Sequence, residues 1–283
     1  MSKSVSVVIP AHNAEDTIAQ AIVSVRGQTS APDETVVACD GCTDKTAQTA
    51  RDAGARVVEI PRSNGSVARN AGARAAKGEL LFFLDADDWW EPEKIERHLD
   101  VWSRFEGSVV MDRSTPWNPD GSRSYWTGGL DHEGPLSWGA FLSHKAWPSG
   151  SGFSVRKECY WSVAGFNEGL NKFQDVDFWV RASHACGDVY TMRDSLTNYR
   201  LSESGSVSRT TAFIEENLQV LFAGWPFATE EQKERFRSHA YLMAAEVTPW
   251  PASVAYFREA HWPVGRRFFW KSLLHSLRAQ RSA

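Results

Sequence analysis

The sequence lacks the marks of a membrane-embedded or nucleic-acid-binding protein. None of its apolar runs approaches the roughly 20 residues that a helix needs to cross a bilayer. The formal net charge is −4, so we expect no general attraction to nucleic acid. Residues 1–4 lead directly into a strand pattern and show no signal peptide. We therefore expect a cytoplasmic protein without a nucleic-acid partner.

Cysteine is scarce, with four residues in a chain of 283. Cys39 and Cys42 have the C-x-x-C spacing of some redox and zinc sites, but Cys159 and Cys186 do not form a second close pair. Cys39 also closes an apolar strand pattern, where a free thiol behaves as a small hydrophobic side chain. We favour that structural role over a metal or redox site.

The first 112 residues alternate strand and helix patterns, which is typical of a parallel sheet with crossover helices. The expected strands are residues 5–9, 35–39, 56–60, 80–84 and 108–111. Asn13 is placed to cap the helix after the first strand. After an irregular segment, the patterns predict a strand at 151–155, a helix at 173–185 and a strand at 187–200.

Residues 80–88 are the most informative part of the sequence. Five apolar residues read as a strand buried on both faces, and three carboxylates follow where the strand ends. In an extended chain Asp85 and Asp87 point the same way, so they can aim at one cation. Hard divalent ions such as Mg²⁺ and Mn²⁺ prefer oxygen ligands and often hold phosphates. The simpler alternative is a strand end with acidic turn residues.

Polar and turn-forming residues also follow the other strands of the first half. They are residues 10–13, Asp40 with Gly41, and residues 61–65. Ligands of open α/β sheets bind at the carboxyl ends of the strands. The sequence therefore predicts a ligand site at this edge of the sheet.

Four parts of the sequence resemble the family 2 glycosyltransferases, which are inverting enzymes with a GT-A fold. They are residues 6–13 (SVVIPAHN), 40–44 (DGCTD), 64–72 (NGSVARNAG) with 78–79 and 85–88, and 165–168 with 174–181. The resemblance implies an α/β fold of GT-A type, with a Rossmann-like, mostly parallel sheet flanked by helices. It implies a glycosyltransferase domain at 1–210, with a nucleotide-binding half at 1–112 and an acceptor-side half at 113–210. A C-terminal helical extension would follow at 211–283.

The resemblance implies nucleotide-binding roles for five residues. Pro10 and Ala11 would contact the nucleoside through the backbone, in a loop that includes Asn13. Asp40 would accept a hydrogen bond from the imide N–H of uracil or thymine. Arg69 would lie near the nucleotide as a permanently charged donor. The structural alternatives are a turn residue for Asp40 and a surface ion pair for Arg69.

The resemblance also implies a metal site and a base. Asp85, Ala86 and Asp87 would bind the donor, with Asp85 facing the ribose or the metal and Asp87 holding the metal. Asp175 would take the proton from the acceptor hydroxyl as that oxygen attacks the anomeric carbon. The alternative for Asp175 is a helix-start residue. Asp88 is a candidate cap for the helix that follows.

Other positions in the second half are less regular. Asp177 precedes Arg181 by the four residues of a helical ion pair. Gln174 stands where the family commonly has Glu, and Ser202-Glu203 stand where it often has a His that helps to bind the metal or diphosphate. The candidates to replace that His are Ser204, Ser206, Ser208 and Arg209.

We therefore predict a metal-dependent, inverting, non-processive glycosyltransferase that uses Mn²⁺ or Mg²⁺. It would move one sugar from a nucleoside-diphosphate sugar, UDP or dTDP, to an acceptor hydroxyl. One alternative is a non-catalytic sugar-nucleotide-binding module, which would need no base such as Asp175. Another is a phosphatase of the haloacid dehalogenase type, which wants Thr or Val where Trp89 stands.

The C-terminal segment has the pattern of a basic amphipathic helix. Its apolar stripe is Phe269, Trp270, Leu273, Leu274 and Leu277. Such a helix can make a peripheral contact with an anionic membrane. It can equally pack against the catalytic domain or a second subunit in a homodimer, and we favour packing against protein.

Overall fold

The computed structural model describes residues 3–123, 131–143, 149–201 and 214–247. The chain divides into two compact units, Met1–Ser202 and Glu203–Ala283. The described part of the second unit consists of α8 (Ile214–Ala223) and α9 (Glu230–Val247). Within the described ranges, no helix has the length and apolarity needed to cross a bilayer. The predicted amphipathic helix and the candidates at 204–209 lie outside the described residues.

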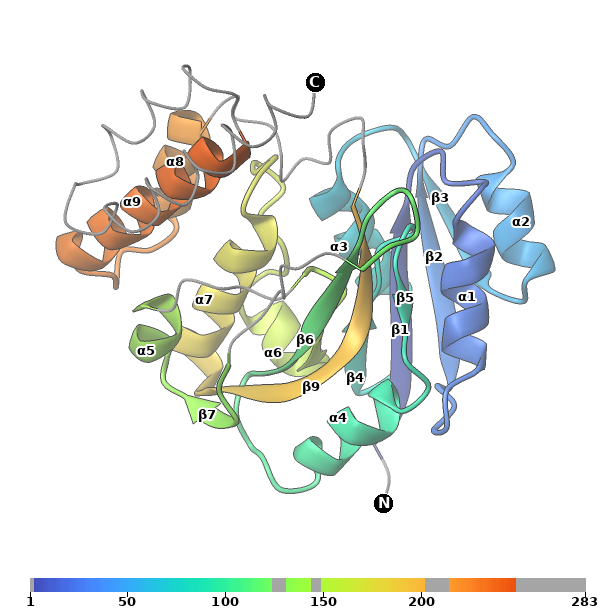
Figure 1. The fold of residues 1–283 in the computed structure, drawn as a ribbon, viewed down its shortest axis with the longest axis horizontal. Helices are drawn as coiled ribbons and strands as arrows, with labels where there is room; N and C mark the ends of the chain where they lie inside the picture. The colour runs from blue at the N-terminus through green and yellow to red at the C-terminus, as the bar shows by residue number, and fades with distance from the viewer. Residues whose placement is uncertain (1–2, 124–130, 144–148, 202–213, 248–283) are drawn as a thin grey trace. The chain divides into compact units, whose positions relative to one another are not determined.

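Nine strands of the first unit form one sheet, with helices packed against it (Figure 1). The strands are β1 (Val5–Ala11), β2 (Glu34–Asp40), β3 (Arg56–Ile60), β4 (Leu80–Phe83), β5 (Trp89–Trp90), β6 (Val109–Trp117), β7 (Gly134–Leu136), β8 (Phe153–Arg156) and β9 (Val189–Arg200). Their order is β3-β2-β1-β4-β8-β6-β9-β5, and β7 pairs with β9 off this path. The helices are α1 (Ile18–Arg26), α2 (Thr46–Asp52), α3 (Gly65–Ala75), α4 (Lys94–Trp102), α5 (Trp138–Ser143), α6 (Lys157–Ser162) and α7 (Gln174–Cys186).

The first half of the sheet has the predicted parallel arrangement. β1 pairs in parallel with β2 and β4, and β2 pairs in parallel with β3. Helices cover both faces because successive side chains of a strand alternate. Val7 packs in the same core as Ile22 of α1, whereas Val8 of the opposite face contacts α3. A Cβ on Gly72 would lie 2.5 Å from Val8 Cγ1, so glycine allows this close approach.

The second half of the sheet is mixed rather than parallel. β8 runs antiparallel to both β4 and β6, so β6 is not the neighbour of β4. The reason is that the chain re-enters the sheet at the carboxyl end of β4, where Gly150 approaches Asp85. A strand that starts at this end runs back against β4, because a parallel neighbour would need a crossover to the other end.

Asn13 does not cap a helix, and this expectation was wrong. α1 begins at Ile18, and its N-cap residue Thr17 makes no side-chain capping bond. The Asn13 side chain instead accepts a hydrogen bond of 2.9 Å from the Thr43 N–H. It therefore ties the loop after β1 to the loop after β2.

The cysteines fall into a bonded pair and two free thiols. Cys159 and Cys186, which the sequence spacing did not pair, form a disulfide with a Cα–Cα distance of 6.1 Å. The bond joins α6 to the last residue of α7. Cys39 is buried and Cys42 is half-buried, both as free thiols.

A fully buried ion pair lies between α4 and the sheet. Lys94 and Asp112 both have 0% exposed side chains and are in ion-pair contact. The Thr197 hydroxyl donates to Asp112 Oδ2 over 2.8 Å, and His98 Nε2 lies 3.2 Å from Oδ1. Burial alone would raise the pKa of Asp112, but the charges and hydrogen bonds of Lys94 and His98 together outweigh it and lower that pKa. Burial and then Lys94 lower the pKa of His98 to about 4, so this imidazole is neutral.

Lys94→Met should lower the free energy of unfolding by about 3–5 kcal/mol, because it leaves Asp112 as an uncompensated buried charge. Lys94→Met with Asp112→Leu should recover most of that loss. Arg97→Met is a matched control on the same helix, because the Arg97–Asp194 pair is half-exposed and worth about 0–1 kcal/mol. Urea denaturation followed by tryptophan fluorescence measures the differences. Equal losses for Lys94→Met and Arg97→Met would contradict the assignment.

Candidate active site

The carboxyl ends of β2, β1 and β4 lie side by side at one edge of the sheet. Asp40 is the last residue of β2, and Asp85 lies two residues beyond the end of β4. Neighbouring strands are about 4.8 Å apart, so two strand spacings separate these positions by about 10 Å. An extended polar ligand can span this edge.

One corner of the edge is built around Asp40, whose side chain is 2% exposed. The Ser63 N–H donates to Asp40 Oδ1 over 2.5 Å, and Arg62 pairs with Oδ2. Pro10 and Ala11 end the neighbouring strand β1, opposite Ala38 and Cys39 of β2. A carboxylate oxygen has two lone pairs, so Asp40 can still accept from a ligand. The structure thus brings Pro10, Ala11, Asn13 and Asp40 together at the ends of β1 and β2.

The second corner is built around an Arg69–Asp85 ion pair. Arg69 Nη2 donates to Asp85 Oδ1 over 2.5 Å. A Cβ on Gly150 would lie 3.5 Å from Asp85 Oδ2 and 3.6 Å from Arg69 Nη2, so Gly150 lies directly beside the pair. Arg69 Nε is buried and makes no hydrogen bond to any described residue. This corner therefore contains a buried donor whose hydrogen-bonding capacity is not used within the described residues.

Residues 85–88, here called the acidic loop, are crowded with negative charge. Desolvation and then the charge of Asp85 raise the pKa of Asp87 to about 6. Burial and then the charges of Asp87 and Asp85 raise the pKa of Asp88 well above its usual range. Such mutual repulsion is what a bound cation would relieve.

Asp85 and Asp87 have the donor chemistry that a hard divalent cation prefers. In the described part of the chain, no three His, Cys, Asp or Glu side chains are grouped to ligate a metal. Magnesium in proteins often uses only one or two carboxylates and completes its shell with water and substrate phosphates. The two carboxylates therefore fit a cation that arrives with a phosphate ligand.

Asp88 does not cap the helix that follows, contrary to expectation. Its side chain is buried and accepts from the Ser151 hydroxyl over 2.5 Å and from the Arg200 N–H over 2.9 Å. The N-cap residue of α4 is Glu93, and it makes no side-chain capping bond. The carboxylate turns inward because these two donors lie behind the acidic loop.

Asp175 lies in the first turn of α7, just after a strained residue. Phe173 has φ 61°, a left-handed conformation that is costly for a bulky side chain and turns the chain sharply into the helix. Burial raises the pKa of Asp175, the charge of Asp85 adds to the rise, and Arg69 opposes it. Asp175 thus shares an electrostatic environment with the Arg69–Asp85 pair.

The predicted ion pair between Asp177 and Arg181 is confirmed, with 2.6 Å between Oδ2 and Nη2. Asp177 is fully buried in this pair, so its role is structural.

Two polar residues had no signal in the sequence that distinguished them. Ser151 binds Asp88, and only the fold brings it to the acidic loop. Lys172 is buried just before α7, and burial lowers its pKa to about 8. Arg62, which binds Asp40, belongs to the segment 61–65 that the sequence predicted to lie at this edge.

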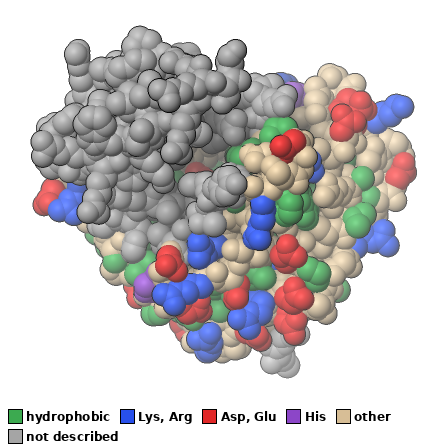
Figure 2. All heavy atoms as spheres, in the orientation of Figure 1, with side chains coloured by type: hydrophobic (Ala, Val, Ile, Leu, Met, Phe, Trp, Pro, Cys, Tyr) green, Lys and Arg blue, Asp and Glu red, His purple; other side chains and the backbone are tan. Residues whose placement is uncertain are grey.

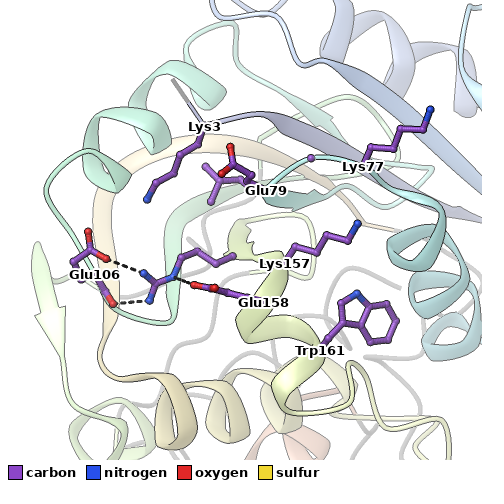
Figure 3. Close-up of a pocket in the computed structure, with 10 residues that line it drawn as sticks. Lys3, Lys77, Glu79, Glu106, Lys157, Glu158 and Trp161 are labelled. Atoms are coloured by element: carbon purple, nitrogen blue, oxygen red, sulfur yellow. Dashed lines mark hydrogen bonds and ion pairs between the residues drawn. The ribbon is translucent and has the colours of Figure 1, made fainter. Parts of the chain in front are cut away.

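A second hollow lies at the opposite end of β4, around its first residue Leu80 (Figure 3). Three of its four cations, Lys3, Arg156 and Lys157, make hydrogen bonds within the protein. Lys3 donates to the Trp102 carbonyl and Lys157 to the Ala76 carbonyl. Arg156 is bound to the carboxylate and the carbonyl of Glu106 and to Glu158, which are the dashed contacts in Figure 3. It also donates to the Gly107 carbonyl. This hollow lies at the end of β4 that is opposite to the acidic loop.

The described residues on the face shown in Figure 2 do not indicate another site. On the face shown in Figure 2, Lys and Arg side chains are interspersed with Asp and Glu, and no large area carries one sign of charge. The carboxyl edge of the sheet is therefore the best-supported site.

A sequence model for the glycosyl transferase family 2 matches residues 6–161, more than half of the chain. This chain belongs to the family 2 glycosyltransferases. The match covers the residues of the Asp40 and Asp85 corners but ends before Asp175.

Two curated relatives match little more than a third of this chain. An uncharacterized glycosyltransferase of Nostoc is 38% identical over 113 residues, which are 38% of this chain and 35% of the relative. The amylovoran biosynthesis glycosyltransferase AmsB of Erwinia amylovora is 32% identical over 112 residues, or 37% of each chain. The matched part thus spans little more than a third of these relatives.

A solved structure resembles most of the chain. Residues 1–349 of TarS from S. aureus, in complex with UDP-GlcNAc, superpose with a TM-score of 0.68 at 19% identity. The match covers 86% of this chain and 71% of that one. This likeness confirms the predicted GT-A type α/β fold.

Asp87→Asn should stabilise the metal-free protein at pH 7.5, with a Tm higher by about 2 °C, because it removes a charge that desolvation and then Asp85 disfavour. Asp87 is exposed, so solvent screening keeps the gain below what the full pKa shift would give. A folded-state pKa of about 6, above the ordinary 3.8, means that ionising Asp87 costs stability as pH rises from 4 through 6. The Tm difference should therefore grow over this range and disappear below about pH 4. Differential scanning calorimetry measures it.

The matched control is Asp100→Asn, at an exposed position of α4, which should leave Tm unchanged. An Asp87→Asn protein that is less stable than wild type at pH 7.5 would contradict the proposed repulsion.

Proposed function

We propose that this family 2 glycosyltransferase moves a single sugar from a nucleoside-diphosphate sugar to an acceptor hydroxyl with inversion at the anomeric carbon. The observation that supports this most is the electrostatic coupling of Asp175 to the Arg69–Asp85 pair at the carboxyl edge. A single-displacement transfer needs a base on one side of the sugar and charge stabilisation on the other. The complex of TarS with UDP-GlcNAc supports a UDP-linked donor.

The Asp40 corner would hold the nucleoside. Asp40 can accept the imide N–H of uracil or thymine, a donor that cytosine lacks. Pro10 and Ala11 would contact the base and ribose through the backbone at the end of β1, and Asn13 holds their loop to the next one. UDP and dTDP are the nucleotides that fit this chemistry.

The Asp85 corner would hold the diphosphate. Asp85 and Asp87, with the buried Ala86 between them, would bind Mn²⁺ or Mg²⁺. When bound, that ion would supply positive charge where negative charge develops on the leaving group. The free Nε of Arg69 can donate to the same phosphates, and its guanidinium stays charged at any working pH.

Asp175 would act as the base. Its carboxylate takes the proton of the acceptor hydroxyl, the acceptor oxygen bonds to the anomeric carbon, and the bond to the diphosphate oxygen breaks with its electron pair. The raised pKa of Asp175 makes it a stronger base than an exposed carboxylate. A non-catalytic binding module would not need an acid in this place.

Four further statements stay predictions: the domain limits, the cytoplasmic location, a peripheral membrane contact and a homodimer. The haloacid dehalogenase alternative is disfavoured because the acidic loop follows β4 rather than the first strand of the chain.

Asp175→Asn should bind UDP as wild type does but transfer or hydrolyse a UDP-sugar at least about 100-fold more slowly, because only the base is lost. Asp87→Asn should fail differently, with weak UDP binding in the presence of Mn²⁺. Release of UDP with Mn²⁺ and with EDTA measures both variants. Wild-type turnover in Asp175→Asn, or undiminished turnover in EDTA, would refute the mechanism.

Asp40→Asn should lower the preference of the protein for UDP over CDP by about tenfold or more, because the amide can no longer accept as a full carboxylate. The ratio of the two dissociation constants, from calorimetry, is more informative than either alone, since Asp40 also binds Ser63. Asp52→Asn, at the exposed end of α2, is the control. An unchanged ratio in Asp40→Asn would exclude Asp40 from base recognition.

A further inference from the structure

A single buried hydroxyl joins the two ends of the acidic loop. Ser151 lies just before β8 and is 0% exposed. Its Oγ accepts a hydrogen bond of 2.9 Å from the Asp85 N–H and donates one of 2.5 Å to Asp88 Oδ2. The two residues that would hold the cation, Asp85 and Asp87, therefore belong to the short segment that this hydroxyl spans.

Asp88 serves this arrangement as an internal anchor. Its side chain is 1% exposed, and its second oxygen accepts from the Arg200 N–H over 2.9 Å. Its own N–H donates to the Asp85 carbonyl over 3.1 Å, which closes the acidic loop into a tight turn. A carboxylate so enclosed cannot reach a ligand, so its contribution is to the shape of the loop.

The backbone carbonyl of Ser151 is itself held by buried hydrogen bonds. It accepts from Trp90 Nε1 over 2.9 Å and lies 3.4 Å from the Thr197 hydroxyl. Thr197 in turn donates to Asp112, the partner of Lys94 in the buried ion pair. The hydroxyl therefore projects from a rigid, buried support, and its direction is fixed.

We propose that Ser151 is a positioning residue that sets the shape of the acidic loop for cation and diphosphate binding. This inference rests on the proposed function, in which Asp85 and Asp87 hold a divalent ion. Without the hydroxyl, the Asp85 N–H and one oxygen of Asp88 lose their buried partner, so both groups must seek new ones. The loop then opens, and the positions of the two carboxylates relative to each other change.

Ser154→Ala provides a matched control for Ser151→Ala. Ser154 is also a serine with 0% exposure, three residues further along the chain. Its hydroxyl accepts from Trp102 Nε1 over 2.8 Å and contacts His98 Nδ1 over 2.8 Å, away from the acidic loop. Both substitutions remove one buried hydroxyl, but only one of them touches residues 85–88.

The test is calorimetric titration of UDP into wild type and both full-length variants, with Mn²⁺ and with EDTA. In EDTA all three proteins should bind UDP equally, because the Asp40 corner lies on the other side of β1. Mn²⁺ should strengthen UDP binding in wild type and in Ser154→Ala. In Ser151→Ala that strengthening should fall at least about tenfold. Thermal unfolding of both variants shows whether they lose stability alike.

The possible results distinguish a failure of the Ser151 role from a failure of the metal-dependent function. If Mn²⁺ strengthens UDP binding as much in Ser151→Ala as in wild type, the positioning role is wrong while the proposed function stands. If Mn²⁺ has no effect on UDP binding in wild type, the metal-dependent function fails, and this inference fails with it. Equal losses of the Mn²⁺ effect in both serine variants would show general destabilisation and would also overturn the role of Ser151.

Ser151→Cys covers the case in which Ser151→Ala does not fold. A thiol keeps a donor and an acceptor at this position, but it is larger than the hydroxyl and weaker in both roles. The Mn²⁺ effect should then lie below the wild-type value. A full wild-type effect in Ser151→Cys would overturn the proposal.

Discussion

The rest of the site depends on the confinement of three adjacent carboxylates at the end of one buried strand. The three carboxylates have different surroundings. Asp85 pairs with Arg69, and Asp88 is held inside the protein by Ser151 and by the backbone of Arg200. Asp87 keeps its charge beside Asp85 without a cation of its own among the ion pairs of the described residues, and its pKa is raised. The three carboxylates therefore differ in state. Asp85 is ion-paired, Asp87 is exposed, and Asp88 is held inside the protein.

The first half of the fold could be predicted from local sequence patterns. β3 (Arg56–Ile60) has the predicted bounds, and β4 is fully buried as its unbroken apolar run indicates. The direction of β8 could not be predicted in this way, because it depends on where the chain returns after residues 113–150. Asn13 and Asp88 were misjudged for the same reason. Each looked like a local cap, but each has a partner from a distant part of the chain, such as Ser151, 63 residues from Asp88.

The sequence predicted those site residues that follow the end of a strand or that match a motif of the family. The fold brings Asp40, Asp85, Arg69 and Asp175 to one edge, although their roles in transfer are proposals. The buried residues that hold the site in place could not be predicted from the sequence. A serine before β8, or a lysine buried within α4, has no pattern that separates it from ordinary serines and lysines. Such residues are recognised only from their burial and hydrogen bonds.

The most direct test of the account is a crystal structure with UDP and Mn²⁺, in which anomalous scattering locates the metal. The account predicts one strong peak in contact with Asp87 and with the diphosphate, with the uracil ring at Asp40 and Asp175 facing the far side of the sugar site. A nucleotide bound instead in the hollow at the opposite end of β4, beside Lys77 and Trp161, would contradict it. So would a metal peak distant from the acidic loop.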